Sequence, residues 1–248
     1  MRKRGLVFLG MVGAAAYFGY RQARSYLSPL NPEKARAYGR YLVARHRRVM
    51  VIGSDLVDIH RFAGGALRLM AESGSDVQIV VASGANAASP ENRDLPAAVP
   101  LGLEPPQIRD MGRLTEEIRS LWRRMRPDTV LCPDPTQPIP LRSVPARSVG
   151  RAAHTLKQSM PEPVEMVFYA TRLPNAVVDI GPLVEDKVQG VKPENGDGAL
   201  KRIDMVIWSK LSSAKTGFSY AEAFRFLELG EAVLAQEESL REESRITD

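Results

Sequence analysis

The sequence predicts an α/β fold, with a Rossmann-like, mostly parallel sheet that carries helices on both faces. From residue 48 onward, short apolar runs alternate with amphipathic stretches in the order strand, helix, strand, helix, strand. One of these runs, Val77 to Ala82, groups Val and Ile as buried parallel strands do. The 248 residues have an ordinary composition and suffice for one sizeable core without disulfides. Strands joined by helices pair in parallel and place the helices on both faces of the sheet.

The predicted strands are short apolar runs bounded by turn residues. They cover residues 49–52, 77–82, 129–132, 164–170 and 176–180. The predicted helices carry apolar residues at helical spacing or a start signal. They cover residues 61–72, 114–125, 143–159 and 182–191. A last long helix is expected from Ser219, because Ser219-Tyr-Ala-Glu222 fits a capping box, and it should fade into the charged tail 237–248.

The predicted strand ends mark the place where a functional site is expected. Two long segments, residues 83–110 and 133–141, lack regular periodicity, and both follow predicted strands. The loop Gly53 to Asp58 follows the first strand. Ligands of open α/β sheets bind beyond the carboxyl ends of the strands. No G-x-G-x-x-G sequence and no P-loop lysine lie there, so nucleotide binding is not indicated; Gly64-Gly65 is expected to be a close packing point of helix on sheet.

The N-terminal segment predicts a membrane helix. Sixteen uncharged residues, Gly5 to Tyr20, lie between basic residues at positions 2–4 and Arg21 and Arg24. As a helix this run spans about 24 Å, somewhat less than a ~30 Å hydrocarbon core, which snorkelling arginines can accommodate. We expect an anchor at 1–24, a basic juxtamembrane linker at 25–47, the α/β domain at 48–230 and a charged helical tail at 231–248. A cleaved signal peptide and a buried soluble helix are the alternatives.

The distribution of charge points to a membrane surface as the partner and away from nucleic acid. Residues 1–48 hold eleven Lys or Arg and one acid, a net +10, so the rest of a chain with net +5 carries −5. A basic segment on an acidic body argues against a nucleic-acid-binding domain. Beside the anchor, this charge would lie near anionic headgroups. More positive charges follow the apolar run than precede it, which weakly favours a single-pass anchor with the body on the cytoplasmic side.

A series of motifs follows in order between residues 47 and 228. They are residues 49–65, which end in Gly64-Gly65, Glu72 to Val81, Arg93, Leu101-Gly-Leu103, Arg126-Pro-Asp-Thr-Val130, Pro174 to Ile180 with Lys187, and Tyr220-Ala-Glu-Ala-Phe224. In these motifs the chain resembles the LmbE-like or PIG-L de-N-acetylases. The resemblance implies a Rossmann-like domain that removes the acetyl group from N-acetylglucosamine-type conjugates.

The chemistry of that family needs zinc held by two His and one Asp, with a second Asp as general base for the metal-bound water. Aligned on Gly64-Gly65, the first metal His falls on Asp55, the catalytic Asp on Val57 and the metal Asp on Asp58; the second His falls on Leu141. Only Asp58 matches a ligand position. The resemblance therefore predicts a vestigial pocket without a catalytic residue, made of Asp55, Val57, Asp58, Arg93 and Leu141.

Asp55 and Asp58 admit two interpretations. As paired carboxylates they could serve acid–base chemistry; in the other interpretation, which we favour, one of them caps the following helix. His60 could add a third ligand if it turned inward, but its place beside Arg61 favours the solvent side.

The remaining candidate groups, two histidines and one cysteine, are expected to have structural rather than catalytic roles. His46 and His154 are expected to be solvated or satisfied in the core rather than ligating. The single Cys132 excludes an internal disulfide framework and is expected to be a buried hydrophobe rather than a nucleophile.

The sequence thus predicts a membrane-tethered deacetylase-like domain without catalytic activity or zinc. We expect it to bind a glycan or sugar conjugate, or a protein partner. The first alternative is an active zinc-dependent N-deacetylase with atypical metal ligands. The second is a structural subunit paired with an active homologue.

Overall fold

The structure is a computed structural model that describes residues 21, 24–44, 47–83, 96–136, 144–160, 163–189 and 198–228. Its strands form one seven-stranded sheet in the order β3-β2-β1-β4-β5-β7-β6. The strands are β1 (Arg48–Gly53), β2 (Asp76–Ser83), β3 (Ala98–Leu103), β4 (Thr129–Pro133), β5 (Glu165–Tyr169), β6 (Ala176–Asp179) and β7 (Ala221–Phe226). Strands β1 to β5 pair in parallel, whereas β7 is antiparallel to both β5 and β6. The predicted mostly parallel α/β sheet is confirmed.

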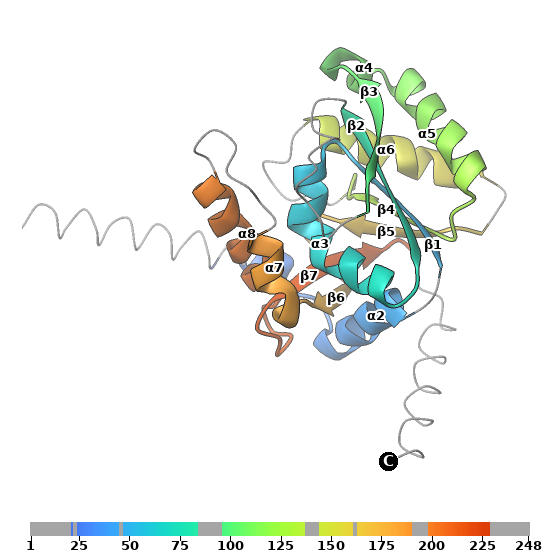
Figure 1. Cartoon of the computed structure of the whole chain (residues 1–248). Coiled ribbons are helices and arrows are strands. Elements are labelled where there is room, and N and C mark those ends of the chain that lie inside the picture. The colour runs from blue at the N-terminus through green and yellow to red at the C-terminus, as the bar shows by residue number, and fades with distance from the viewer. Residues whose placement is uncertain are drawn as a thin grey trace, which may run out of the picture.

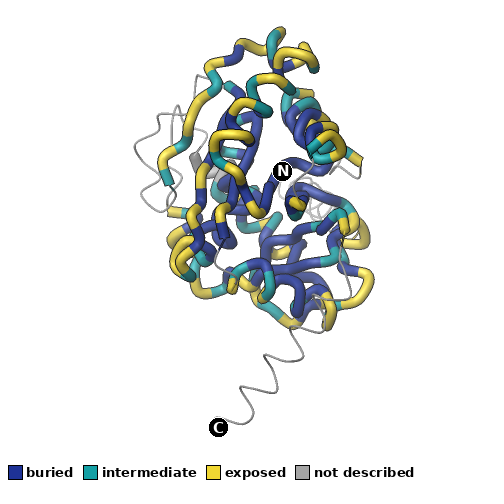
Figure 2. The backbone as a smooth tube through the Cα atoms, turned by 90° about the vertical axis from the view of Figure 1, so that its right-hand side faces the viewer, coloured by how far each residue is buried: buried dark blue, intermediate teal, exposed yellow. Residues whose placement is uncertain are grey.

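Helices cover both faces of the sheet (Figure 1). The helical segments are α2 (Pro32–Ala44), α3 (Leu56–Glu72), α4 (Pro105–Arg109), α5 (Met111–Met125), α6 (Val144–Ser159), the 3₁₀ turn η1 (Gly181–Leu183), α7 (Val184–Gln189) and α8 (Gly198–Ser212). Helices α2, α3 and α8 contribute to the core on one face, and α4, α5 and α6 to the core on the other. Figure 2 shows the buried strands in dark blue between helices whose outer turns are exposed.

The alternation of side chains along β1 explains why helices must cover both faces of the sheet. Val49 and Val51 belong to the core beneath α3, and Met50 and Ile52 belong to the core beneath α5 and α6. Successive side chains of a strand point to opposite faces. All four are at most 1% exposed, so a strand apolar on both faces is buried on both faces.

Helix α2 packs on the outermost strand, within the residues predicted as a basic linker. Its buried face includes Tyr38 and Leu42, which join the core beneath α3. Gly39 allows the close approach, because a Cβ there would lie 1.8 Å from the carbonyl oxygen of Val177 in β6. The segment that follows the apolar N-terminal run is therefore part of the folded domain.

Three predictions about secondary structure need correction. The helix expected from Ser219 is wrong, because residues 221–226 form β7, and the pairing of β7 with β5 and β6 outweighs the local capping-box pattern. The segment 83–110 is more regular than expected, since it contains β3 and α4. Helix α3 begins at Leu56, before the predicted start at Arg61.

Residues 1–20, 22 and 23 of the predicted anchor lie outside the described residues, as do the whole predicted tail and residues 84–95 and 137–143. Within the part of the chain that the structure describes, no helix combines the length and hydrophobicity that a membrane span requires.

Candidate functional site

The carboxyl ends of β1, β4 and β5 lie at one edge of the sheet, because these strands are parallel. Three short segments follow them: residues 54–58, 134–136 and 170–171. Strand β7 runs the other way, so its first residues, Ala221 to Ala223, lie at the same edge. The candidate site is built from these four segments and from α8, which packs on β7.

Asp55 caps helix α3. Its backbone is extended, with φ −151° and ψ 164°, and its carboxylate accepts a hydrogen bond of 2.7 Å from the backbone N–H of Asp58. The carboxylate satisfies one of the amides that a helix start leaves without an intrahelical partner and lies favourably in the helix dipole. The interpretation that one of the two aspartates caps the helix is confirmed, and the structure shows that it is Asp55.

Asp58 is buried in the first turn of α3, at 7% exposed. One of its carboxylate oxygens accepts a hydrogen bond of 3.3 Å from the Ser54 hydroxyl, and the other lies 3.5 Å from Nη1 of Arg61. Arg61 also places Nε 2.7 Å from the carboxylate of Asp204 in α8. The Arg61 guanidinium therefore lies beside Asp58, the one carboxylate at a position where the resembled family has a metal ligand.

The other residues of the predicted vestigial pocket are placed only in part. Val57 lies half-buried in the same helical turn as Asp58 and offers only hydrocarbon where the family needs a proton acceptor. Arg93 and Leu141 lie outside the described residues. The vestigial pocket as a whole stays a prediction.

The described residues do not fit a zinc ion. Zinc in proteins takes its ligands from His, Cys, Asp and Glu. Asp55 is engaged as a helix cap and Asp58 faces the Arg61 cation, which disfavours a second cation nearby. Within the described ranges, no three side chains of those four types gather closely enough to hold a metal.

His60 is buried, and the prediction that it faces solvent is wrong. It is 3% exposed, and its Nε2 lies 2.8 Å from the carbonyl oxygen of Lys187 in α7. Its ring packs over Gly64, where a Cβ would come within 2.9 Å of Nδ1. His60 therefore joins α3 to α7 and is not a third ligand beside the two aspartates.

Two other predicted groups have the expected structural roles. His154 packs edge-on against Phe168, with ring centroids 6.0 Å apart. Cys132 is fully buried; burial, together with the nearby Asp134 charge, raises the pKa of its thiol well above the usual value. Its thiolate is therefore scarce at neutral pH, which agrees with a buried hydrophobe rather than a nucleophile.

A buried ion pair joins α7 and β7 to the middle of α3. The ammonium of Lys187 lies 2.6 Å from the carboxylate of Glu222, and both side chains are 2% exposed. The Glu222 carboxylate accepts hydrogen bonds from the backbone N–H groups of Gly65 and Ala66 at 2.9 and 2.7 Å. The Lys187 ammonium donates one of 2.8 Å to the Arg61 carbonyl. Each charge is paired and further hydrogen-bonded, as burial requires.

The absence of a side chain at Gly65 brings α3 close to this pair. A Cβ there would lie 2.6 Å from Cγ2 of Ile180 and 3.4 Å from the Glu222 carboxylate. The prediction that Gly64-Gly65 marks a close packing point is confirmed. The motif residues Lys187 and Glu222 are structural here.

A second buried carboxylate, Asp134, directly follows β4 and was missed by the sequence analysis. Two nitrogens of Arg225 in β7 donate to it at 2.8 and 2.7 Å, and the Thr171 hydroxyl donates at 2.6 Å. The backbone N–H and hydroxyl of Thr136 donate to it as well. This cluster ties the loops after β4 and β5 to β7. The only signal in the sequence is an acidic residue at a strand end.

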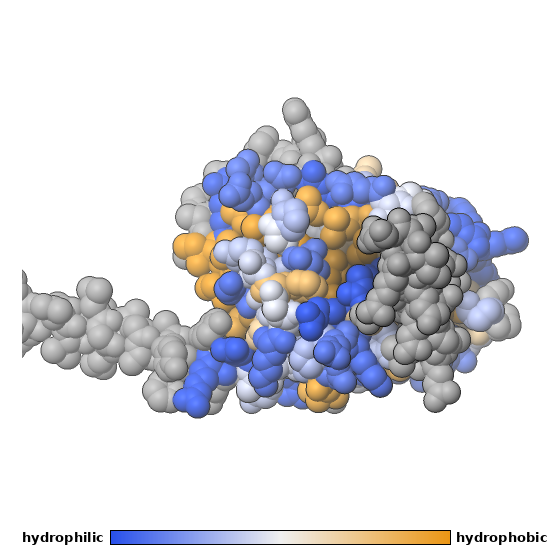
Figure 3. All heavy atoms as spheres, turned by 90° about the horizontal axis from the view of Figure 1, so that it is seen from below, coloured by the Kyte–Doolittle hydropathy of each residue, from blue (hydrophilic) through white to orange (hydrophobic). Residues whose placement is uncertain are grey.

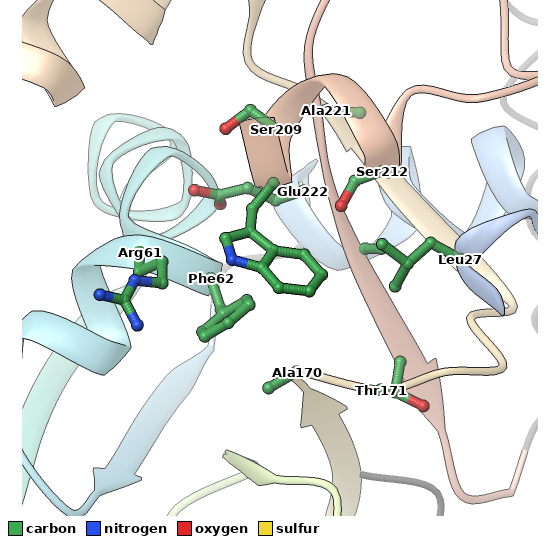
Figure 4. A pocket seen from close by; sticks show the side chains of 11 residues that line it. Leu27, Arg61, Phe62, Ala170, Thr171, Ser209, Ser212, Ala221 and Glu222 are labelled. Atoms are coloured by element: carbon green, nitrogen blue, oxygen red, sulfur yellow. The ribbon is translucent and has the colours of Figure 1, made fainter. Parts of the chain in front are cut away.

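A small pocket opens between α3, α8 and the start of β7 (Figure 4). Phe62 and Arg61 line it from α3, Ser209 and Ser212 from α8, and Thr171 from the segment after β5. The hollow measures about 260 Å³ with its open mouth. Its interior leaves room for about one water molecule, so a larger ligand would have to bind across the mouth.

Trp208 of α8 and Leu27, which precedes α2, complete the apolar part of this wall. The indole ring packs on Phe62, with centroids 5.6 Å apart and a tilt of 57°. Two aromatic rings, two serine hydroxyls and one arginine are thus collected at one mouth. Small-molecule sites also combine aromatic surface with a few polar groups, but they are larger, at about 300–1,000 Å³.

Comparisons with known proteins place the fold. No protein-family model matches the sequence, and no curated protein matches it either. Among solved structures, N,N'-diacetylchitobiose deacetylase from Pyrococcus horikoshii is similar at TM-score 0.56 and 18% identity, over 73% of this chain and 83% of that chain. The conserved protein TT1542 from Thermus thermophilus is similar at TM-score 0.59 and 18% identity, over 72% of this chain and 94% of that chain.

The same arrangement also occurs in GalB, the 4-carboxy-2-hydroxymuconate hydratase from Pseudomonas putida. That similarity has a TM-score of 0.51 and 15% identity, over 74% of this chain and 97% of that chain. The chain therefore has an LmbE-like deacetylase fold, as its motifs predicted. Because a hydratase has a similar fold, function must be argued from the site.

Proposed function

We propose that this chain is a membrane-tethered domain that binds a glycan or sugar conjugate without hydrolysing it. One observation carries the proposal: at the positions where the resembled deacetylases hold metal and base, Asp58 is paired with Arg61 and Val57 is a hydrocarbon. A deacetylase of that type needs a metal-bound water and a group that takes its proton. An aspartate paired with an arginine and a neighbouring valine can border a binding surface but cannot perform that step.

The proposed binding surface is the mouth of the pocket beside Trp208. Sugar rings present apolar C–H faces that pack on aromatic rings, and their hydroxyl and acetamido groups hydrogen-bond to polar side chains. The Trp208 and Phe62 rings supply the first kind of contact. Arg61, whose side chain is 23% exposed, lies beside them and carries polar groups for the second.

Titration of N,N'-diacetylchitobiose into the full chain in detergent tests this surface. The expected result is saturable binding that Trp208→Ala weakens by about an order of magnitude, since an aromatic contact contributes about 0.5–1.5 kcal/mol beyond the area that it buries. Ile207→Ala is the matched control, because Ile207 precedes Trp208 on α8 and is 46% exposed. Equal affinity of all three proteins would remove the pocket mouth from the proposal.

The alternative is an active zinc-dependent N-deacetylase with atypical ligands. Its ligands would have to come in part from residues 84–95 and 137–143, which follow β2 and β4 in the sequence and lie outside the described residues. Metal analysis of the purified full chain, with an assay of acetate release from a generic N-acetylglucosamine conjugate, separates the two. Stoichiometric zinc together with turnover that Asp58→Ala abolishes would overturn the binding-only proposal.

Restoring the family's residues is a stricter test of the alignment. The triple variant Asp55→His, Val57→Asp, Leu141→His should gain measurable zinc binding. Adding Arg61→Met should strengthen that binding further, because it removes a cation beside Asp58. If neither variant binds zinc, Asp55 and Leu141 are not the positions of the missing ligands.

The tether is tested by fractionation. The full chain should sediment with membranes and stay there in high salt, whereas a variant that starts at residue 21 should not. A full chain that stays in the supernatant at low salt would end the membrane part of the proposal.

A further inference from the structure

An exposed apolar and basic patch surrounds the point where the described chain begins. Leu30 is 84% exposed, Tyr26 46% and Leu173 43%, so three large hydrophobic side chains are open to solvent. The guanidinium of Arg172 lies 5.9 Å from the centre of the Tyr26 ring, so the turn after β5 and the segment before α2 meet here. Arg24 lies exposed one helical turn before Leu27. We call these five residues the N-terminal patch: Arg24, Tyr26, Leu30, Arg172 and Leu173.

The sequence around the patch has one sign of charge. Residues 1–32 contain no acidic residue, and their basic residues lie directly before and after the uncharged run Gly5 to Tyr20. An exposed tyrosine, exposed leucines and arginines are the side chains that gather where a protein meets the headgroup layer of a bilayer. Anionic lipids would add a favourable interaction with each arginine near the surface.

Residues of the N-terminal patch are sequence neighbours of residues that line the pocket. Leu27 lines the pocket and follows Tyr26; Thr171 lines it and precedes Arg172. In Figure 4, Leu27 and Thr171 lie on the side of the pocket away from Arg61 and Phe62 of α3. Figure 3 shows apolar side chains open to solvent among charged ones on the underside of the molecule, where α2 lies in Figure 1.

We infer that the N-terminal patch is the surface with which the body rests on an anionic membrane, so that the pocket opens beside the lipid headgroups. This rests on the tether of the proposed function and adds an orientation to it. The occupant is a lipid surface rather than a second copy of the chain, because the patch adjoins an uncharged run and is flanked by cations alone in residues 1–32. A ligand reaching the pocket would then approach along the membrane.

Single-cysteine labelling of the full chain tests the orientation. Cys132, the only native cysteine, is fully buried with a raised thiol pKa, so alkylation at pH 7 should modify introduced cysteines and leave it intact unless the protein is unfolded. Leu30→Cys and Leu173→Cys place an environment-sensitive fluorophore in the patch. Thr155→Cys, on the exposed side of α6 across the sheet, is the matched control.

Each labelled protein is reconstituted in vesicles of phosphatidylcholine and phosphatidylserine, some of whose lipids carry bromine on the acyl chains. The expected result is a blue shift and quenching by bromine at positions 30 and 173, and neither at position 155. Both effects should decrease in vesicles of phosphatidylcholine alone, because the arginines then lose their anionic partners.

Two results would overturn the inference while the tether stands. In the first, the protein stays with the vesicles and the labels at 30 and 173 behave like the label at 155. In the second, these labels are shielded from aqueous iodide but are not quenched by the lipid, which would mean that a second copy or another segment of the chain covers the patch. A protein that does not stay with the vesicles contradicts the tether itself.

Discussion

Two charged clusters touch helix α3, and they differ in the distance between their opposite charges and in the exposure of their side chains. At its N-terminus, Asp58 has a weak hydroxyl contact and a guanidinium at 3.5 Å, with side chains 10% and 23% exposed. In its middle, Lys187 and Glu222 are 2.6 Å apart, both 2% exposed, and hold three backbone groups of α3. Both clusters come from motifs shared with the resembled deacetylases. In this structure Lys187 and Glu222 stabilise the fold, whereas Asp58, the position that the resemblance assigns to a metal ligand, lies against the Arg61 guanidinium.

The largest effect is expected in the middle of α3. Glu222→Gln leaves the Lys187 ammonium buried without its counter-charge and should lower the free energy of unfolding by about 3–5 kcal/mol. Urea denaturation followed by circular dichroism measures this. The control is Asp128→Asn, since the Arg48–Asp128 pair is about half exposed and should contribute less than ~1 kcal/mol.

A double variant sharpens this prediction. Lys187→Met with Glu222→Leu leaves neither charge alone and should recover much of the lost stability. If the double variant is as unstable as Glu222→Gln, the loss comes from packing around α3 and not from an unpaired charge.

A smaller effect is expected at the start of α3. Asp55→Ala removes the cap and should cost about 1 kcal/mol, whereas Asp55→Ser keeps a capping oxygen and should cost only a few tenths. Thermal unfolding of the two variants gives the comparison. Equal losses for both would show that the Asp55 carboxylate acts through its charge or another partner.

The smallest effect is expected at Asp58. Asp58→Asn keeps the shape and an oxygen for the Ser54 hydroxyl and loses a partly exposed ion pair, so the cost should stay below about 1 kcal/mol. The same unfolding experiments measure it. A cost as large as that of Glu222→Gln would contradict the contrast between the two clusters.

The parallel strands β1, β2, β4 and β5 could be predicted because they are largely apolar and alternate with periodic helices. The parallel strand β3 was not predicted, because most of its residues are not buried. The antiparallel strand β7 could not be predicted, because Ser219 to Glu222 fits a local helix signal and only pairing with β5 and β6 decides otherwise. Helix α8 was not predicted at all.

At the site, the cap at Asp55 could be predicted from its place between strand and helix. The second partner of Arg61 could not, because Asp204 lies on α8, far along the chain. The burial of His60 depends on α7 covering that side of α3, which no pattern near His60 indicates.

Leu27 sits in the core at 2% exposed, only seven residues after Tyr20, the last residue of the uncharged run. A connection of that length reaches at most about 25 Å when fully extended, at ~3.3–3.6 Å per residue. If the uncharged run anchors the chain in a bilayer, as we propose, the attachment point of the body stays within that distance of the bilayer. The body would then meet only ligands close to the bilayer. The number of ligand molecules per area of membrane, rather than the bulk ligand concentration, would set how often it binds.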